Sequence, residues 1–333
     1  MVSTVPGTGA RTLPSTSAPS ELGPPRSRRR LLGIRLTVER RRRLVGLLFL
    51  LPVVIYICVL YGYPLVVNAL TSFENYSISS FYTGKAPLDG LVNYRMLWHS
   101  GDLGQYVETT VIFTACSLAA QFGIGLALAV FFKHNFPLNS LLRSLLLLPW
   151  LLPVIVSATI YRWVLDQQYG VLNQVLLALH FIGHPVPWLD SGNAALASVI
   201  LVNVWAGVPF NMVILFGGLQ TIPEDRYEAA AIDGAGASQR FRYVTLPLLK
   251  PVTLVVLMLG LIYTLRAFDV IYVLTQGGPG NATQTLTTWS YLLTFQDYSI
   301  GEGAAVSNLL MVVIIILGLL YIRTTRETEA STS

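Results

Sequence analysis

Six long runs of apolar residues, nearly free of charged side chains, constrain this chain more than any other feature of its sequence. A bilayer core about 30 Å thick needs roughly 20 apolar residues of α-helix to cross it. Strands of a membrane barrel alternate apolar and polar residues over about ten positions, whereas these runs are continuous. The sequence therefore predicts an all-α polytopic membrane protein with six transmembrane helices. The predicted spans are Leu44–Ser72, Thr109–Phe132, Ser144–Tyr161, Ser191–Gln220, Pro251–Tyr272 and Gly303–Ile322.

The composition excludes several other classes of protein. Of the 333 residues, 53% are hydrophobic and 12% are charged, and that charged share is about half the usual value for a soluble domain. Both cysteines, Cys58 and Cys116, lie in apolar runs, so neither a disulfide framework nor a thiolate metal site is expected. The sequence has no histidine spacing typical of a zinc enzyme and no phosphate-binding loop of the form G-x-x-x-x-G-K-S/T. We therefore expect no metal, no bound cofactor and no nucleotide hydrolysis in this chain.

The distribution of Lys and Arg predicts the orientation, because segments that stay in the cytoplasm are enriched in these residues. With the N-terminus in the cytoplasm, ten Arg before residue 44 and eight further Lys and Arg fall on the inside, whereas Lys85 and Arg95 fall in outside loops. Six spans then return the C-terminus to the cytoplasm. Because orientation accounts for most of the net charge of +5, nucleic acid is not expected as a partner.

The predicted spans divide the chain into three parts. Residues 1–43 are expected to form a disordered basic cytoplasmic tail, because the first two thirds of this segment contain almost no large apolar side chains. Its arginines are candidates to bind the anionic headgroups of membrane lipid. Residues 44–322 form the six-helix membrane domain, and residues 323–333 form a short cytoplasmic tail. An apolar stretch at residues 171–182 is too short to span the bilayer and predicts an interfacial helix.

The inside loop between the fourth and fifth spans, residues 221–247, has a distinctive pattern. Pro223 and the two acidic residues after it favour the start of a short helix, and Gly234 or Gly236 can end that helix. A second helical start follows, with Ser238 as its candidate N-cap. On local chemistry alone, an interfacial linker between two spans explains this pattern as well.

The order of residues in this loop resembles the EAA loop of the membrane subunits of bacterial ATP-binding-cassette (ABC) importers. In that pattern, Glu-Ala-Ala is followed at fixed spacing by Gly, an aliphatic residue and Leu-Pro. The matching residues are Glu228, Ala229, Ala230, Gly234, Val244, Leu246 and Pro247, with Val244 where isoleucine is usual. The extended stretch Glu-Ala-Ala-x-x-Asp-Gly-Ala, which includes Asp233, is similar to the carbohydrate-importer branch. Residues 268–280 resemble the exit of the fifth helix in the maltose-permease and glycerol-phosphate-permease group.

This resemblance covers about residues 44–322 and implies the type I ABC importer permease fold. It implies a non-catalytic subunit of the bacterial plasma (inner) membrane, with a second homologous permease subunit completing the pore. Two ATP-binding subunits, or a homodimer of one, would bind ATP and Mg, and an extracytoplasmic binding protein would deliver a sugar. The residues that would couple this chain to the ATPase are Glu228, Ala229, Ala230, Asp233, Gly234, Leu246 and Pro247.

Polar residues at bilayer depth mark a candidate transport pathway, because they are costly to place there. If the fourth helix runs inward and the fifth runs outward, Asn203, Trp205, Arg266 and Asp269 lie at similar depth, and Asn211 lies near or just past the middle. A sugar site needs polar groups for the hydroxyls and an aromatic face for the ring. Alternatively, Arg266 and Asp269, spaced i and i+3, pair with each other, or Arg266 contacts the partner permease.

The sequence favours the permease subunit of a sugar importer over three other functions. A permease for a glycerol phosphodiester or another polyol phosphate is the leading alternative, since Arg266 suits a phosphate. An ion-coupled secondary transporter needs ionisable groups near the midplane; Asp269 alone qualifies, and the EAA loop would stay unexplained. A membrane-embedded enzyme needs a nucleophile, paired carboxylates or metal ligands at one depth, and no such cluster is present in the sequence.

Overall fold

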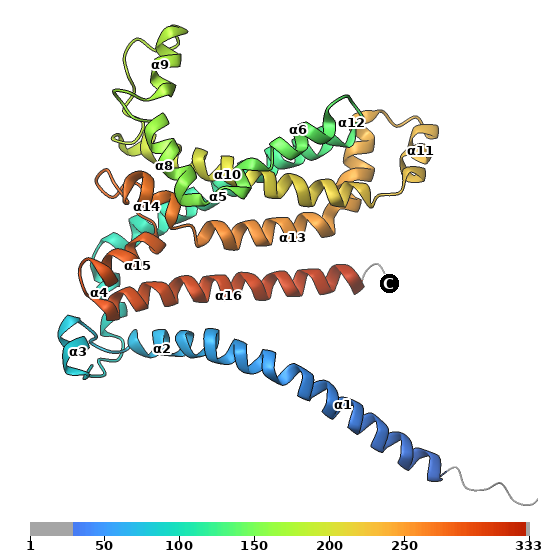
Figure 1. Cartoon of the computed structure of the whole chain (residues 1–333), viewed down its shortest axis with the longest axis horizontal. Helices are drawn as coiled ribbons and strands as arrows, with labels where there is room; N and C mark the ends of the chain where they lie inside the picture. Colours follow the sequence, from blue (N-terminus) through green and yellow to red (C-terminus); the bar gives the residue numbers. More distant parts are fainter. Residues whose placement is uncertain (1–28, 331–333) are drawn as a thin grey trace, which may run out of the picture. The chain divides into compact units, whose positions relative to one another are not determined.

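The computed structural model describes residues 29–330, which are mostly helical (Figure 1). Within that range the one β feature is an isolated bridge between Glu74 and Leu88. The chain divides into two compact units, Met1–Tyr63 and Pro64–Ser333. The helical elements are α1 (Arg29–Ile57), η1 (Cys58–Gly62), α2 (Tyr63–Thr71), α3 (Ile78–Thr83), α4 (Val92–His99), α5 (Asp102–Lys133), α6 (Asn139–Leu145), α7 (Leu148–Leu151), α8 (Val154–Val164), α9 (Val171–Ala178), α10 (Gly192–Gln220), α11 (Glu224–Ile232), α12 (Ala237–Arg240), η2 (Phe241–Thr245), α13 (Leu246–Leu265), α14 (Asp269–Thr275), α15 (Leu286–Phe295) and α16 (Ile300–Ala330).

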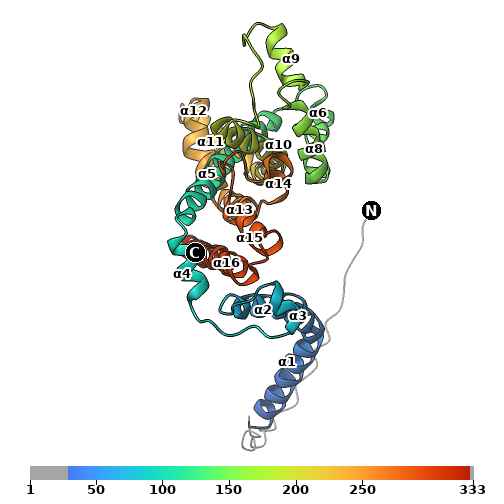
Figure 2. The ribbon, with the colours of Figure 1, turned by 90° about the vertical axis from the view of Figure 1, so that its left-hand side faces the viewer.

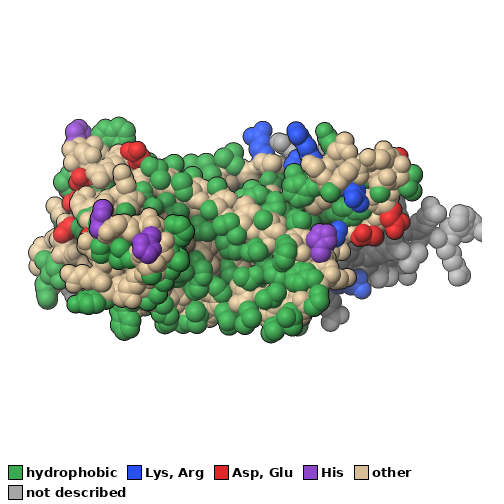
Figure 3. Space-filling model, turned by 90° about the horizontal axis from the view of Figure 1, so that it is seen from above, with side chains coloured by type: hydrophobic (Ala, Val, Ile, Leu, Met, Phe, Trp, Pro, Cys, Tyr) green, Lys and Arg blue, Asp and Glu red, His purple; other side chains and the backbone are tan. Residues whose placement is uncertain are grey.

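Five helical stretches of the described residues are long and apolar enough to cross a membrane. The predicted total of six is reached when the bent pair Asn139–Leu151 and Val154–Val164 is counted as one span. Apolar side chains cover most of the middle of the face drawn in Figure 3, and charged and His side chains gather toward its two ends. The five stretches are Val45–Thr71, Asp102–Lys133, Gly192–Gln220, Ala237–Leu265 and Ile300–Thr324.

The structure describes part of each predicted tail, and the N-terminal one differs there from the expected disorder. Helix α1 begins at Arg29, so residues 29–43, predicted as part of a disordered tail, are helical. Helix α16 continues to Ala330, so most of the predicted C-terminal tail is helical as well. In both places the apolar span is already helical. Adding one residue to an existing helix costs far less free energy than forming its first turn. Residues 1–28 and 331–333 lie outside the described residues.

The third span is not the continuous helix predicted over Ser144–Tyr161. Helices α6 and α7 are followed by α8 at a bend of 95°. The bend lies at Pro153, and Leu152 before it has the extended backbone (φ −75°, ψ 141°) that a residue preceding proline prefers. Proline therefore ends one helix and begins the next at this point.

The fifth span is shifted toward the N-terminus relative to its prediction, Pro251–Tyr272. The helical stretch begins at Ala237, passes through the π-helical turn η2 and ends at Leu265. Residues 266–268 are not helical, and α14 begins after them at Asp269. We call this non-helical segment, 266–268, the hinge.

Helix α5 is the central packing element of the unit Pro64–Ser333. It contributes buried side chains to all three apolar clusters, one with α4, α15 and α16, one with α8, α10 and α14, and one with α10 and α13. Helix α10 packs along it, while α9 extends away from these helices (Figures 1 and 2). The two helices can approach this closely because two of the contact positions are glycine. A Cβ at Gly125 would clash with the Cβ of Asn211 at 2.6 Å, and a Cβ at Gly207 would clash with the amide of Gln121 at 2.5 Å.

Hydrogen bonds, more than apolar packing, attach α2 to the rest of its unit. None of the α2 side chains is buried, but Asn68 donates through Nδ2 to Oδ1 of Asn308 on α16 at 2.8 Å. The hydroxyls of Ser72 and Tyr94 lie 2.9 Å apart, and Asn308 donates to the Tyr94 hydroxyl at 3.5 Å. Such bonds between membrane helices contribute about 0.6–2 kcal/mol each.

Replacement of Asn308 by Leu should therefore lower the stability of the purified protein by about 1–2 kcal/mol, since Asn68 loses its side-chain partner. The measurement is the midpoint of thermal unfolding in detergent. The control is Val312→Leu, an exposed position on the same helix, which should leave the midpoint unchanged. Equal midpoints for Asn308→Leu and the control would contradict the attachment by hydrogen bonds.

Candidate functional site

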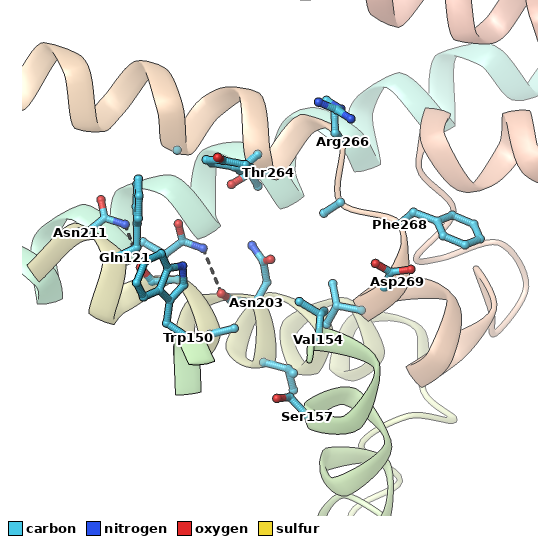
Figure 4. Close-up of a pocket in the computed structure, with 18 residues that line it drawn as sticks. Gln121, Trp150, Val154, Ser157, Asn203, Asn211, Thr264, Arg266, Phe268 and Asp269 are labelled. Atoms are coloured by element: carbon cyan, nitrogen blue, oxygen red, sulfur yellow. Dashed lines mark hydrogen bonds between the residues drawn. The ribbon is translucent and has the colours of Figure 1, made fainter. Parts of the chain in front are cut away.

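A cavity of about 450 Å³ lies between α10, α13 and α14, and α5, α7 and α8 complete its wall (Figure 4). Its size falls in the range of about 300–1,000 Å³ typical of small-molecule sites. Two breaks in membrane helices form it: the bend at Pro153 places α7 and α8 on one side, and the hinge ends α13 on the other. Irregular backbone at membrane depth is tolerated where it lines such a cavity.

Uncharged polar side chains from three helices line the deeper part of the cavity. Ser157 Oγ, Asn203 Nδ2 and Asn211 Oδ1 are buried and have no hydrogen-bond partner in the protein. Two other amide groups have partners. Asn211 Nδ2 donates to the Gly207 carbonyl of its own helix at 3.0 Å, and Gln121 Nε2 on α5 donates to the Asn203 carbonyl on α10 at 3.0 Å, which joins these two helices. A buried polar atom without a partner costs about 1–3 kcal/mol. A ligand rich in hydroxyl groups can remove that cost.

Three aromatic side chains form another part of the wall. Phe210 on α10 lies 5.9 Å, between ring centroids, from Trp150 on α7 and 5.9 Å from Tyr263 on α13. The side chains of Trp150 and Tyr263 are 52% and 65% exposed. The cavity therefore combines apolar ring faces with groups that donate and accept hydrogen bonds.

Four of the five residues predicted for the pathway meet at this cavity: Asn203, Asn211, Arg266 and Asp269. Trp205 does not line it, and its ring packs edge-on against Tyr161 with centroids 5.1 Å apart. The reason is helical geometry, since a residue two positions after Asn203 points about 200° away around the helix.

The alternative interpretation, in which Arg266 pairs with Asp269, is not observed. The hinge interrupts the helix between them, and no ion pair between these two described residues is present. Both side chains are exposed, and Figure 4 shows them pointing in different directions. The i, i+3 rule applies to a continuous helix, and here the helix is not continuous.

Sequence reasoning missed Gln121, Trp150, Ser157 and Phe210, which also line the cavity. Gln121 was the one residue that the sequence could have indicated. It is a polar side chain within the apolar run of the second span, and placing such a side chain at membrane depth is costly. The others carried no signal of their own. Their place in the wall depends on the bend at Pro153, which changes the direction of the third span.

The loop at the other end of α10 has the two short helices expected for it, α11 and α12. Gly234 ends the first with φ +80°, a conformation that favours glycine. The amide of Ala235 donates to the Ala230 carbonyl at 2.9 Å, and that of Gly234 donates to the Ala231 carbonyl at 3.0 Å, which is the Schellman arrangement. The predicted N-cap, Ser238, lies inside α12, whose N-cap is Gly236.

The residues predicted to couple this chain to an ATPase lie at an accessible surface. Ala230 is half-buried, and Ile232 beside it is 87% exposed. The remaining predicted residues are all exposed, namely Glu228, Ala229, Asp233, Gly234, Leu246 and Pro247.

One side chain of α11 faces the membrane helices. The hydroxyl of Tyr227 lies 3.1 Å from Oγ1 of Thr245 in η2, and the Lys133 ammonium at the end of α5 lies 3.8 Å from the centre of its ring. A cation over an aromatic face is attracted by about 0.5–2 kcal/mol. Tyr227 therefore joins α11 to both α5 and the start of the fifth span.

Several named proteins are similar to this chain over most of its length. The trehalose/maltose transport system permease protein of Thermococcus litoralis is 34% identical over 87% of this chain and 96% of its own. The sulfoquinovosyl glycerol transport system permease protein of Agrobacterium fabrum is 34% identical over 86% and 92%. The diacetylchitobiose uptake system permease protein of Streptomyces coelicolor is 30% identical over 87% and 89%.

The fold is also that of a solved ABC importer. A subunit of the bacterial ABC transporter that imports the acidic polysaccharide alginate matches 88% of this chain and 99% of its own, with a TM-score of 0.74 and 21% identity. The predicted permease fold is thereby confirmed. The family model described as "Binding-protein-dependent transport system inner membrane component" matches residues 121–325. This chain belongs to that family, whose members are membrane permease subunits of ABC transporters.

Proposed function

We propose that this chain forms half of the translocation pathway of an importer for a sugar or oligosaccharide, and that the sugar passes through the cavity of Figure 4. The observation that carries the proposal is the set of three buried, unpartnered polar atoms of Ser157, Asn203 and Asn211 opposite an aromatic wall. Relatives named for trehalose or maltose, sulfoquinovosyl glycerol and diacetylchitobiose support the same substrate class.

The charge of the cavity favours a neutral sugar over a phosphate ester. The groups in its deeper part are amides and hydroxyls, which bond to sugar hydroxyls without requiring a charge. Arg266 and Asp269 at the hinge carry opposite charges, and both are exposed. A phosphate site needs a net positive charge close to the ligand, and Asp269 offsets Arg266. The same exposure argues against Asp269 as the buried ion-coupling group of a secondary transporter.

The rest of the importer would surround this chain as follows. The N-terminus and the α11 end face the cytoplasm, where Lys and Arg are expected, and Figure 3 shows these side chains gathered toward the end that carries α11 and α12. Two ATP-binding subunits bind ATP and Mg, and one of them docks on the exposed residues of α11. A second permease subunit completes the pore, and an extracytoplasmic binding protein delivers the sugar to the opposite end. The alginate transporter was solved with its pentasaccharide-bound periplasmic protein.

Replacement of Asn203 by Leu should lower ATP-driven sugar uptake roughly tenfold, because one hydrogen bond to the sugar, worth about 1–1.5 kcal/mol, is lost. Uptake would be measured in proteoliposomes that contain the assembled importer and its binding protein. The matched control is Asn193→Leu, the same substitution at an exposed position near the start of α10. If both variants transport equally well, the cavity is not the pathway.

Replacement of Gly234 by Val should uncouple the ATPase while membrane insertion stays intact. A β-branched side chain at φ +80° costs about 1–2 kcal/mol or more, so the turn after α11 would change shape. The measurement is copurification of the ATPase subunit together with sugar-stimulated ATP hydrolysis. Gly236→Val is the control in the same loop, since its φ of −70° suits any residue. Wild-type coupling in Gly234→Val would rule out this role for α11.

A further inference from the structure

Beyond the end of α13, three aromatic side chains contact one another and a fourth contacts one of the three. Phe268 of the hinge lies 5.0 Å from Tyr272 on α14 and 4.8 Å from Tyr291 on α15, measured between ring centroids. Tyr272 and Tyr291 are 4.9 Å apart, and Tyr291 lies 5.0 Å from Phe295. We call these four side chains the aromatic ladder.

The aromatic ladder is not part of the apolar core of the protein. Helix α14 buries Ile271 and Leu274 in one cluster, and α15 buries Trp289 and Leu293 in another. The ladder rings lie on the other sides of these helices and belong to none of the three buried clusters. None of the four is buried, and Phe295 is 62% exposed. The packing of α14 and α15 therefore leaves the ladder accessible.

The aromatic ladder is continuous with the sugar cavity. Phe268 and its neighbour Asp269 line the cavity, and Figure 4 shows the Phe268 ring pointing away from Asn203, past the end of α13. From there the rings continue to Phe295. Polar groups lie beside them, since Gln296 donates through Nε2 to the Tyr272 hydroxyl at 3.3 Å.

Resting on the function proposed above, we infer that the aromatic ladder is a second carbohydrate subsite, which holds the sugar ring next to the one in the cavity. The C–H face of a sugar ring packs on an aromatic face, and the hydroxyls at its edge find partners in the Tyr272 and Tyr291 phenols and Gln296. The substrate is accordingly an oligosaccharide of at least two rings.

Protection of engineered cysteines from a thiol reagent tests this inference. The assembled importer without its binding protein would carry Cys58→Ser and Cys116→Ser, which remove both natural cysteines. Phe295→Cys reports on the ladder and Tyr263→Cys on the cavity, while Tyr169→Cys, at a position 79% exposed outside both, is the matched control. The probes are glucose, maltose, trehalose and diacetylchitobiose. Bound sugar at four times its dissociation constant should slow labelling about fivefold.

The expected result is slower labelling of Phe295→Cys with at least one disaccharide but not with glucose, and no protection of Tyr169→Cys. Adding Tyr291→Leu to Phe295→Cys should abolish that protection. If a sugar protects Tyr263→Cys alone, or glucose protects Phe295→Cys as strongly as the disaccharides do, the second subsite is refuted while the proposed function stands. If no probe protects either cysteine, the proposed sugar cavity fails together with the subsite.

Discussion

The contact between α5 and α10 is the interaction on which the site depends. Because residue 207 is glycine, the Gln121 amide fits against α10 and donates to the Asn203 carbonyl. The backbone of Gly125 lies equally close to Asn211. These two approaches fix the rotation of α10 relative to α5, and with it the place of Asn203 and Asn211 in the cavity wall. Larger residues at either glycine would separate the helices and change the direction of both amides.

Two breaks in helices then create space beside this rigid pair. A straight third span would run along α10 and fill the volume that α7 and α8 leave open, and a fifth span continuing beyond Leu265 would cover Asn203. The bend at Pro153 and the hinge 266–268 prevent both. The freed backbone at these points lies at the cavity wall, where a polar ligand or water can bond to it. The two helix breaks therefore both shape the cavity and add polar backbone groups to its wall.

The sequence predicted the long apolar spans, the two-helix loop and four of the residues that line the cavity, because each of these predictions rests on local chemistry. Long apolar runs define spans, a glycine with positive φ ends α11, and polar residues in apolar runs must face something other than lipid. Trp205 was assigned to the pathway by depth alone, without its direction around α10. The break after Leu265 had no sequence signal, since no proline or glycine lies at 266–268. The wall formed by Trp150 and Phe210 depends on contacts between distant segments.

Helix α5 and the fifth span, which contains α13, run from the α11 end of the protein to the cavity. A movement of α11 can therefore be transmitted to the cavity wall. Tyr227 contacts Lys133 at the end of α5 and Thr245 at the start of the fifth span, and both helices continue into the cavity wall. A displacement of α11 by a docked partner would therefore move both helices together. Because α5 is bound tightly to α10, whereas α13 ends at the hinge, relative motion should concentrate at 266–268. That segment carries Arg266 and Phe268, so motion there would change the opening of the cavity at this end while its amide groups keep their positions.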